Sequence, residues 1–148
     1  DYRLRLAKQF GADISINAKD YSAEMLRSLN QGRLADLVIV STGSPSAIEQ
    51  ALGSVERGGT ILFFAPTEKD RKIPLPFNDL FWRTEISLTS SYAGSPADYK
   101  EALGLIISRK LDVSGMITHR LSLSETGRGF KLVVEAQESI KVIIYPQK

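Results

Sequence analysis

Uninterrupted apolar runs mark the centre of this chain. Residues 37–40 (Leu-Val-Ile-Val) and 60–65 (Thr-Ile-Leu-Phe-Phe-Ala) show no alternation with polar residues. A strand of this kind has apolar side chains on both faces, so it must be covered on both faces. That is the condition of a central strand in a parallel sheet with helices above and below. The pattern therefore predicts two buried strands, with the strand at residues 36–40 at the centre of the sheet.

The first apolar run ends in a small polar segment, Ser41, Thr42 and Gly43. Ser44 and Pro45 follow and predict a helix start, with Ser as the N-cap and Pro at the first helical position. In open parallel sheets, ligands bind beyond the carboxyl ends of the strands. Ser41, Thr42 and Gly43 are therefore the first candidates for a functional site.

The other segments alternate between helical and strand patterns. Helices are predicted at residues 1–10, 21–30, 46–57, 78–83, 96–110 and from 125 onward, and strands at 14–17, 85–91, 116–121 and 140–145. Capping-box sequences open two of these helices, at residues 95–98 and 122–125. The apolar stripe of the helix at 96–110 is predicted to be buried; its members are Ala102, Leu103, Ile106 and Ile107. Strands and helices that alternate at spacings too long for hairpins predict an α/β fold with a parallel sheet.

Composition narrows the class of protein. The 148 residues suit one domain, and 43% of them are hydrophobic, which is enough for a core. The net charge is +2 with acids and bases interspersed, which argues against a nucleic-acid-binding surface. There is no cysteine, no apolar run long enough to span a membrane and no signal peptide, so a cytoplasmic protein is expected. The chain begins at Asp1 inside a predicted helix, which suggests a fragment of a longer polypeptide.

Few residues carry a recognisable chemical motif. The segment Gly127-Arg128-Gly129 lacks the third glycine of a phosphate-binding loop and does not follow a strand, so an ordinary helix is the better interpretation. His119 is the single histidine, and with no cysteine beside it a zinc site in this chain is not expected. Ser90 and Ser91 have no base partner evident in the sequence. The residues alone lead to a doubly wound α/β domain with a cleft at its strand ends, and to no reaction.

Five segments, spread in order over the whole chain, suggest a family. They are residues 1–13 (Asp-Tyr-Arg-Leu through Gly-Ala-Asp), 40–43 (Val-Ser-Thr-Gly), 58–66 (Gly-Gly-Thr through Phe-Ala-Pro), 117–123 (Ile-Thr-His-Arg-Leu-Ser-Leu) and 139–143 (Ser-Ile-Lys-Val-Ile). Together they resemble the C-terminal half of medium-chain dehydrogenases, the zinc-dependent alcohol, sorbitol and threonine dehydrogenase family. The resemblance implies a partial, Rossmann-like doubly wound sheet, followed by a closing strand–helix–strand segment.

The resemblance also implies a nicotinamide dinucleotide, NAD(P), with NAD favoured over NADP. Arg3 matches a basic residue that contacts the adenosine ribose, and Lys141 matches one near the pyrophosphate. The positions matching the rest of the cofactor site are Ser41, Thr42 and Gly43 for its adenosine and central part, Phe64, Ala65 and Pro66 for the nicotinamide carboxamide, and Leu88, Thr89 and Ser90 for the nicotinamide end. The family usually has Gly where this chain has Ala65. A Lys at the start of a strand can neutralise phosphate as a point charge.

In the family, the zinc ligands, the proton relay, the glycine-rich loop and the ribose-binding acid all precede the position of Asp1. The resemblance therefore implies no catalytic and no metal-binding residue in this chain, and no activity of the chain alone. Residues 1–113 are expected to be the remainder of a dinucleotide-binding domain, and residues 114–148 a segment that returns to the catalytic domain. The expected substrate of the parent protein is a small alcohol or polyol. A homo-oligomer formed through Glu85 to Ser91 is also expected.

Two alternatives stay open at this point. One is a zinc-independent quinone reductase of the same superfamily. The other is a non-catalytic fragment that binds a nucleotide or associates with itself, since a sheet that lacks its early strands presents an edge to other chains.

Overall fold

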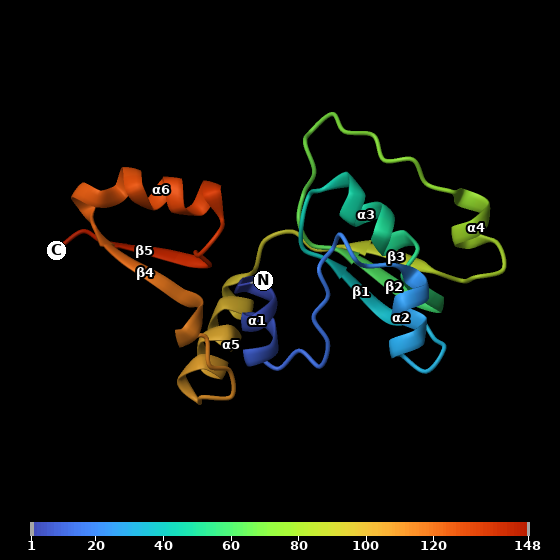
Figure 1. The fold of residues 1–148 in the computed structure, drawn as a ribbon, viewed down its shortest axis with the longest axis horizontal. Helices are drawn as coiled ribbons and strands as arrows, with labels where there is room; N and C mark the ends of the chain where they lie inside the picture. The colour runs from blue at the N-terminus through green and yellow to red at the C-terminus, as the bar shows by residue number, and fades with distance from the viewer. Residues whose placement is uncertain (1, 148) are drawn as a thin grey trace. The chain divides into compact units, whose positions relative to one another are not determined.

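The computed structural model describes residues 2–147 and consists of two compact units. One unit, here called the sheet unit, is Asp13–Ala93, and the other, the closing unit, is Asp1–Ala12 together with Gly94–Lys148. Figure 1 labels their helices and strands. The predicted boundary at residue 113 separates two functional domains, which need not coincide with the two compact units. It stays a prediction.

The sheet unit contains a three-stranded parallel sheet. Its elements are α2 (Ala23–Leu29), β1 (Ala35–Val40), α3 (Pro45–Leu52), β2 (Val55–Phe63), α4 (Phe77–Phe81) and β3 (Ser87–Ser90). The strand order is β1-β2-β3, and both strand pairs are parallel. The parallel α/β sheet predicted from strand–helix alternation is therefore confirmed.

The core of the sheet unit lies between α3 and one face of the sheet. Val40, Ile48, Ala51, Val55 and Ile61 form its buried cluster, and Ile61 at the middle of β2 has no exposed surface. These side chains come from β1, α3 and β2, so their burial fixes the helix on the strands. Because burying each large aliphatic side chain contributes roughly 2 kcal/mol, this cluster is the main stabilising feature of the unit.

The predicted central position of β1 is wrong for the residues described here. β1 is an edge strand with β2 on one side. Leu37 is 57% exposed and Ile39 is 56% exposed, while Val40 is buried. The apolar run satisfied the sequence criterion for coverage on both faces, but within the sheet unit the covered face is the one that packs on α3.

The end of α3 also differs from the prediction. The helix ends at Leu52 rather than at residue 57, and β2 already begins at Val55. Val55 fits a helical stripe, but it is only 5% exposed because it packs into the core as the first residue of the strand. Gly58 and Gly59, which follow the predicted end of the helix, lie in an irregularity of β2 where Ala35 pairs with Val55 but Leu37 pairs with Thr60. Gly58 has φ +72°, a left-handed conformation that favours glycine.

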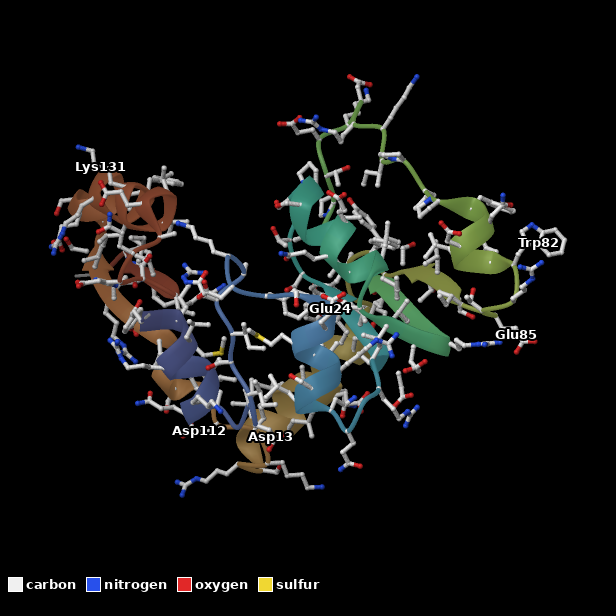
Figure 2. The ribbon with its side chains drawn as sticks, turned by 45° about the vertical axis from the view of Figure 1, so that its right-hand side comes forward. Asp13, Glu24, Trp82, Glu85, Asp112 and Lys131 are labelled. Atoms are coloured by element: carbon white, nitrogen blue, oxygen red, sulfur yellow. The ribbon has the colours of Figure 1, made fainter. Side chains whose placement is uncertain are left out.

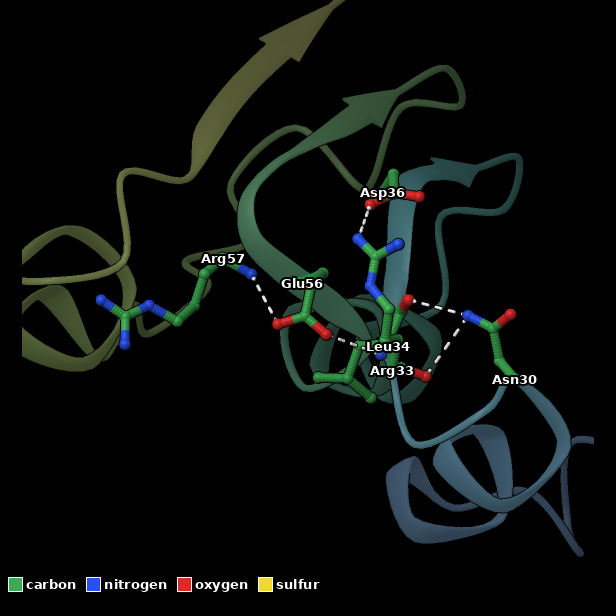
Figure 3. A network of polar contacts seen from close by, with 6 residues as sticks. All are labelled: Asn30, Arg33, Leu34, Asp36, Glu56 and Arg57. Atoms are coloured by element: carbon green, nitrogen blue, oxygen red, sulfur yellow. Dashed lines mark hydrogen bonds and ion pairs between the residues drawn. The ribbon is translucent and has the colours of Figure 1, made fainter.

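A polar network holds this irregular part of β2 in place (Figure 3). The Glu56 carboxylate accepts hydrogen bonds from the backbone N–H of Leu34 at 2.8 Å and of Arg57 at 3.1 Å. These bonds lower the pKa of Glu56 below its ordinary value, with the Leu34 N–H as the largest cause. The Asn30 side chain donates to the carbonyl oxygens of Arg33 and Leu34, which fixes the approach to β1.

Other parts of the sheet unit depart from expectation in smaller ways. Residues 14–17 form no strand; Ile14 is 48% exposed, and in the described structure the segment has no strand beside it to complete a hydrogen-bonded ladder. The apolar residues of α4 and Trp82 after it form a cluster only in part. Leu80 is buried and the rings of Phe77 and Phe81 lie 4.8 Å apart, but Trp82 is 66% exposed and projects outward in Figure 2.

The closing unit contains a second, two-stranded parallel sheet. Its elements are α1 (Tyr2–Gln9), α5 (Pro96–Ile107), η1 (Ser114–Met116), β4 (Ile117–Ser122), η2 (Leu123–Glu125), α6 (Thr126–Glu135) and β5 (Lys141–Tyr145). β4 and β5 pair in parallel and α6 connects them, which confirms the closing strand–helix–strand segment. Gly129 of α6 faces Leu121, Val142 and Ile144. The glycines of the segment Gly-Arg-Gly thus belong to an ordinary helix that packs closely on its sheet.

Both predicted capping boxes are present. Ser95 and Asp98 exchange side-chain and backbone bonds at the start of α5, and Ser122 and Glu125 do so before α6. Within the closing unit the predicted burial of the α5 stripe is not found, because Leu103 is 55% exposed and Ile107 is 72% exposed. Capping is a local interaction and is set by sequence, whereas burial depends on what covers the helix.

Among residues 2–147, no helix is long and apolar enough to cross a membrane.

Candidate functional site at the strand ends

The carboxyl ends of the three strands in the sheet unit are joined by backbone hydrogen bonds. The N–H groups of Phe64 and Ala65 donate to the carbonyl of Val40 at 3.0 Å and 3.2 Å. The N–H of Ser91 donates to the carbonyl of Phe63 at 3.2 Å. The segments that follow β1, β2 and β3 therefore lie together at one edge of the sheet.

Gly43 and Pro66 are in close backbone contact at this edge. A Cβ atom on Gly43 would overlap the Pro66 carbonyl oxygen and would lie 3.3 Å from the Thr67 Cα. Residue 43 therefore has to be glycine for the two segments to approach each other. Ser44 occupies the predicted N-cap position of α3, but its hydroxyl lies 2.9 Å from the Ser46 hydroxyl and makes no capping bond to the helix backbone.

A cavity of about 410 Å³ opens at this edge. Its walls include Phe64, Ala65 and Pro66 from the end of β2, and Leu88 and Ser90 from β3. The remaining lining residues are Ile48, Phe63, Thr67, Ile73, Leu75, Ser91 and Tyr92. None of these side chains carries a formal charge, so the cavity is apolar with a few hydroxyl groups. Five predicted site residues thus share one cavity, and Pro66 also contacts the backbone of a sixth, Gly43.

The other predicted residues of the sheet unit lie nearby but elsewhere. Ser41 and Thr42 line a separate groove of about 450 Å³ along β1, together with the exposed Leu37 and Ile39. Thr89 pairs with Leu62 in the sheet and is not part of the lining of the cavity at the strand ends. The predicted set is therefore divided between two hollows rather than gathered in one.

A larger cavity of the sheet unit contains none of the predicted residues. It measures about 940 Å³ and is bounded by α3, by residues 72–76 and by α4. Its charged lining residues are Arg27, Glu49, Glu56, Arg57, Lys72 and Asp79. Size alone therefore does not select the functional site, and the position at the carboxyl ends of parallel strands is the better criterion.

The two predicted basic residues belong to the closing unit. The Arg3 guanidinium donates to the carbonyl of Ser139 at 2.9 Å, and Ser139 is 2% exposed. Lys141 is exposed and begins β5 two residues later. The structure thus places Arg3 beside the segment that leads to Lys141, which brings two positive charges to one region of this unit.

Among residues 2–147, the carboxyls with a lowered pKa do not line the cavity at the strand ends. These carboxyls are Glu24, Glu56, Asp98, Asp112 and Glu125, and hydrogen bonds are the largest cause of the lowered pKa of each, at helix starts, at a turn and, for Glu56, in the irregular part of β2. His119 is half-buried, with its Nδ1 atom 3.0 Å from the Thr118 hydroxyl. Among residues 2–147, no group of three or more His, Cys, Asp or Glu side chains could hold a metal ion.

Seven lining residues of the cavity were not among the predicted site residues, and Thr67 and Tyr92 are two of them. Tyr92 comes two residues after Ser90, the last residue of β3. An aromatic residue so near a strand end was the feature of the sequence that could have indicated a place in the cavity. Thr67 has no such signal, because it follows Pro66 at the start of a long polar loop.

A parallel α/β sheet with a cavity at the carboxyl ends of its strands defines a domain of the Rossmann-like class. The chain is similar in structure to an alcohol dehydrogenase from Thermotoga maritima, with a TM-score of 0.84, 24% identity, and coverage of 97% of this chain and 40% of that one. Residues 1–108 match the family model described as zinc-binding dehydrogenase. The chain belongs to the zinc-binding dehydrogenase family.

Relatives in this family match nearly the whole chain. L-threonine 3-dehydrogenase from Bacillus subtilis is 34% identical over 148 residues, which cover 99% of this chain and 42% of the relative. Sorbitol dehydrogenase from Halalkalibacterium halodurans is 28% identical over 148 residues, which cover 97% of this chain and 41% of the relative. The chain therefore spans about two fifths of the length of these relatives, and the predicted family is confirmed.

Proposed function

We propose that this chain is the cofactor-domain portion of a zinc-dependent NAD(P) dehydrogenase that transfers hydride between a secondary alcohol or polyol and nicotinamide. The observation that carries the proposal is an uncharged cavity at the adjacent ends of the parallel strands β2 and β3, with Gly43 from the end of β1 against Pro66 of its wall. Membership of the zinc-binding dehydrogenase family supports it.

The cavity at the strand ends fits the nicotinamide part of such a cofactor. Nicotinamide is a planar ring with no negative charge, and the apolar walls of Phe64, Pro66 and Leu88 can enclose it. Its carboxamide needs hydrogen-bond partners, which the Ser90 hydroxyl and the backbone around Ala65 can supply. We therefore propose Phe64, Ala65, Pro66, Leu88, Thr89 and Ser90 as the residues at the nicotinamide end.

The negatively charged part of the cofactor requires a different environment. The lining of the strand-end cavity has no cation to balance a pyrophosphate. We propose that Lys141 neutralises phosphate charge and that Arg3 contacts the adenosine ribose. We also propose that Ser41, Thr42 and Gly43 line the adenosine and central part of the cofactor, where the free end of β1 offers hydroxyls and exposed backbone.

The role of this chain in the reaction is binding and orientation. When bound, nicotinamide supplies the atom that accepts or returns the hydride. The strand-end residues hold its ring in one orientation and exclude water from one side through their apolar walls. The described residues offer no donor set for zinc, so no step is assigned to a metal in this chain. For the same reason we expect the 148 residues alone to show no alcohol-dependent reduction of NAD.

Several finer assignments belong to the same proposal. NAD is proposed over NADP, residues 1–113 are proposed as the cofactor domain, and residues 114–148 as the segment that returns to the catalytic domain. Oligomerisation through Glu85 to Ser91 is proposed because β3 is the last strand of the described sheet and has a free edge. A cytoplasmic location remains a prediction.

Calorimetric titration of the chain with NADH and with NADPH tests this function. We expect both to bind, with NADH tighter, and the Lys141→Ala variant to bind NADH about tenfold more weakly, because a charge-assisted contact is lost. Lys131→Ala is the matched control. Lys131 lies on α6 of the same unit, and its side chain points outward from that unit in Figure 2. A wild-type chain that binds neither dinucleotide, or an equal loss in both variants, would contradict the proposal.

A further inference from the structure

A second cavity of the sheet unit lies where its strands begin, away from the proposed cofactor site. It measures about 940 Å³, and its lining includes Leu34 just before β1, Val55 at the start of β2 and Ile86 just before β3. It shares only Ile73 and Leu75 with the cavity at the strand ends. All of its lining residues belong to the sheet unit, so this unit forms the cavity alone.

The most deeply buried lining residues of this cavity are apolar. Leu34, Val55 and Leu80 are 7%, 5% and 3% exposed. Leu52 and Ile73 are half-buried and line the same cavity. Sites for small molecules typically offer about 300–1,000 Å³ and have mostly apolar walls with a few polar groups. The cavity therefore has the size and the lining of such a site.

The wall that α4 contributes is tied to β2 by hydrogen bonds. The N–H of Gly58 donates to the carbonyl of Thr84 at 2.7 Å, and the Thr84 hydroxyl donates to the carbonyl of Leu80. On either side of Thr84, Arg83 has φ +71° and Glu85 has φ +54°, conformations that are unfavourable for residues with a side chain. Such conformations are retained where the surrounding structure requires them, and they are frequent at binding sites.

Most of the charged lining residues do not by themselves select the charge of a ligand. Glu56 already accepts two backbone N–H groups, and Arg27 donates to a backbone carbonyl at 3.2 Å. Glu49 on α3 and Asp79 on α4 add two exposed carboxylates, and Lys72 adds an exposed ammonium group. The charges of these five side chains are of mixed sign, so the sixth charged residue, which is an arginine, is the informative one.

The Arg57 guanidinium is available to a ligand. Figure 3 shows its side chain extending away from the Glu56 carboxylate. Arg57 and Thr84 also line an adjoining hollow of about 490 Å³, to which Arg83 and Glu85 contribute. Within the part of the chain that the structure describes, neither guanidinium forms an ion pair. Two unpaired guanidinium groups beside one carboxylate favour an anionic group at this end of the cavity.

We propose that this cavity is a second ligand site of the sheet unit, which takes a small apolar molecule carrying one acidic group. The apolar body of the ligand packs on Leu34, Val55 and Leu80, and its carboxylate or sulfonate pairs with Arg57. A ligand without an acidic group covers the buried lining but makes no contact with the guanidinium. The inference does not depend on the proposed function, because no residue assigned to the cofactor lines this cavity.

Two fluorescent probes that differ in one group test this site. Anilinonaphthalene sulfonate is an apolar molecule with one sulfonate, and phenylnaphthylamine has the same rings without it. Both are expected to bind the 148-residue chain. Arg57→Ala should weaken binding of the sulfonate about tenfold, because a charge-assisted contact is lost, and should leave binding of the neutral probe within about twofold. Arg57→Lys keeps the positive charge and should weaken binding of the sulfonate less than Arg57→Ala does.

Two further variants complete the experiment. Arg71→Ala is the matched control, because Arg71 is an exposed arginine of the same unit that lines neither hollow. Gly53→Trp tests the binding of the apolar body. Gly53 lines the cavity, and a Cβ on it would have only two carbonyl oxygens of α3 within 4 Å, at 3.7 Å and 4.0 Å. The added indole ring should occupy the cavity and weaken binding of both probes.

An unchanged affinity for the sulfonate in Arg57→Ala would overturn the inference, as would an equal loss for both probes or an equal loss in Arg71→Ala. Unchanged binding of both probes to Gly53→Trp would show that they bind elsewhere. Release of the bound sulfonate by NAD would mean that the probe occupies the cofactor site, which also overturns the inference. A chain that binds neither probe contradicts the inference and leaves the proposed function untouched. Circular dichroism of each variant confirms that the fold is retained.

Discussion

Gly43 and Pro66 touch through their backbones, at the point where the segment after β1 meets the segment after β2. A Cβ on residue 43 would overlap the Pro66 carbonyl oxygen and lie 3.2 Å from the Pro66 carbonyl carbon. Both neighbours are backbone atoms, which cannot move aside as the end of a flexible side chain can. The missing side chain of Gly43 thus sets the shape of the strand-end edge.

Gly43→Ala should destabilise the sheet unit by about 2 kcal/mol, since an added methyl group forces the two segments apart. Urea unfolding followed by circular dichroism measures this. Gly53→Ala is the control, because a Cβ on Gly53 would lie 3.7 Å from its nearest neighbour, an ordinary contact, and its φ of −82° suits any residue. Equal stability of the Gly43→Ala variant and the wild type would contradict the close contact.

Gly58→Ala tests the irregularity in β2. Residue 58 has φ +72° and open space around its Cβ position, so the substitution adds backbone strain without a steric clash. We expect a loss of about 1 kcal/mol in the free energy of unfolding. Gly58→Asn should lose less, because Asn tolerates the left-handed conformation better than Ala does. Identical unfolding curves for Gly58→Ala and wild type would show that this part of β2 adopts another conformation in solution.

The Arg3→Ala substitution tests how α1 is held in the closing unit. Its guanidinium bonds the carbonyl of the buried Ser139 at 2.9 Å, so Arg3→Ala leaves that carbonyl without this donor. We expect a loss of about 1 kcal/mol in the free energy of unfolding, measured with urea. Arg5→Ala is the control on the same exposed helix, and it should change stability by less than about 0.5 kcal/mol. Equal losses in both variants would mean that the Ser139 contact does not stabilise the unit.

The lowered pKa of Glu125 predicts that the stability of the fold depends on pH. Its pKa is held below the ordinary value of 4.5, first by the backbone N–H of Ser122, then by the Ser122 hydroxyl, with a smaller contribution from Arg128. A carboxyl whose pKa is lower in the folded than in the unfolded state stabilises the fold above the unfolded pKa. That stabilisation is lost as the pH falls through the folded pKa.

Glu125→Gln removes the titratable carboxyl, so comparison with the wild type measures how much the charge of Glu125 contributes to the free energy of unfolding. At about pH 7 the variant should be less stable than the wild type, and at about pH 3 the difference should shrink as the wild-type carboxylate takes up its proton. Urea unfolding at both pH values gives the comparison. A difference that stays constant with pH would show that the Ser122 bonds do not depend on the charge of Glu125.

Local interactions in this chain could be predicted from sequence, and distant ones could not. The capping boxes at Ser95 and Ser122 depend on residues three positions apart, and both are present. The parallel strands follow from the long connections between them. The cleft at the strand ends was predicted on the same basis, because strand ends of a parallel sheet lie together, and the segments after β1, β2 and β3 do meet at one edge.

The errors arose where two patterns share the same residues. Val55 fits a helical stripe and the start of a strand equally well, and only its place in the core shows that β2 begins there. The apolar stripe of α5 satisfied the criterion for burial, but among the described residues Leu103 remains exposed. Tyr92 was not singled out, because the cavity that it lines is formed by residues from α3, β2, β3 and the loop after β2.

The open side of β1 has a practical consequence for anyone who handles this chain. Its backbone donors and acceptors face outward beside Leu37 and Ile39, a combination that recruits further strands at high concentration. Preparations of the chain by itself are therefore expected to scatter more light as they are concentrated. A single lysine introduced at position 37 should keep such solutions clear.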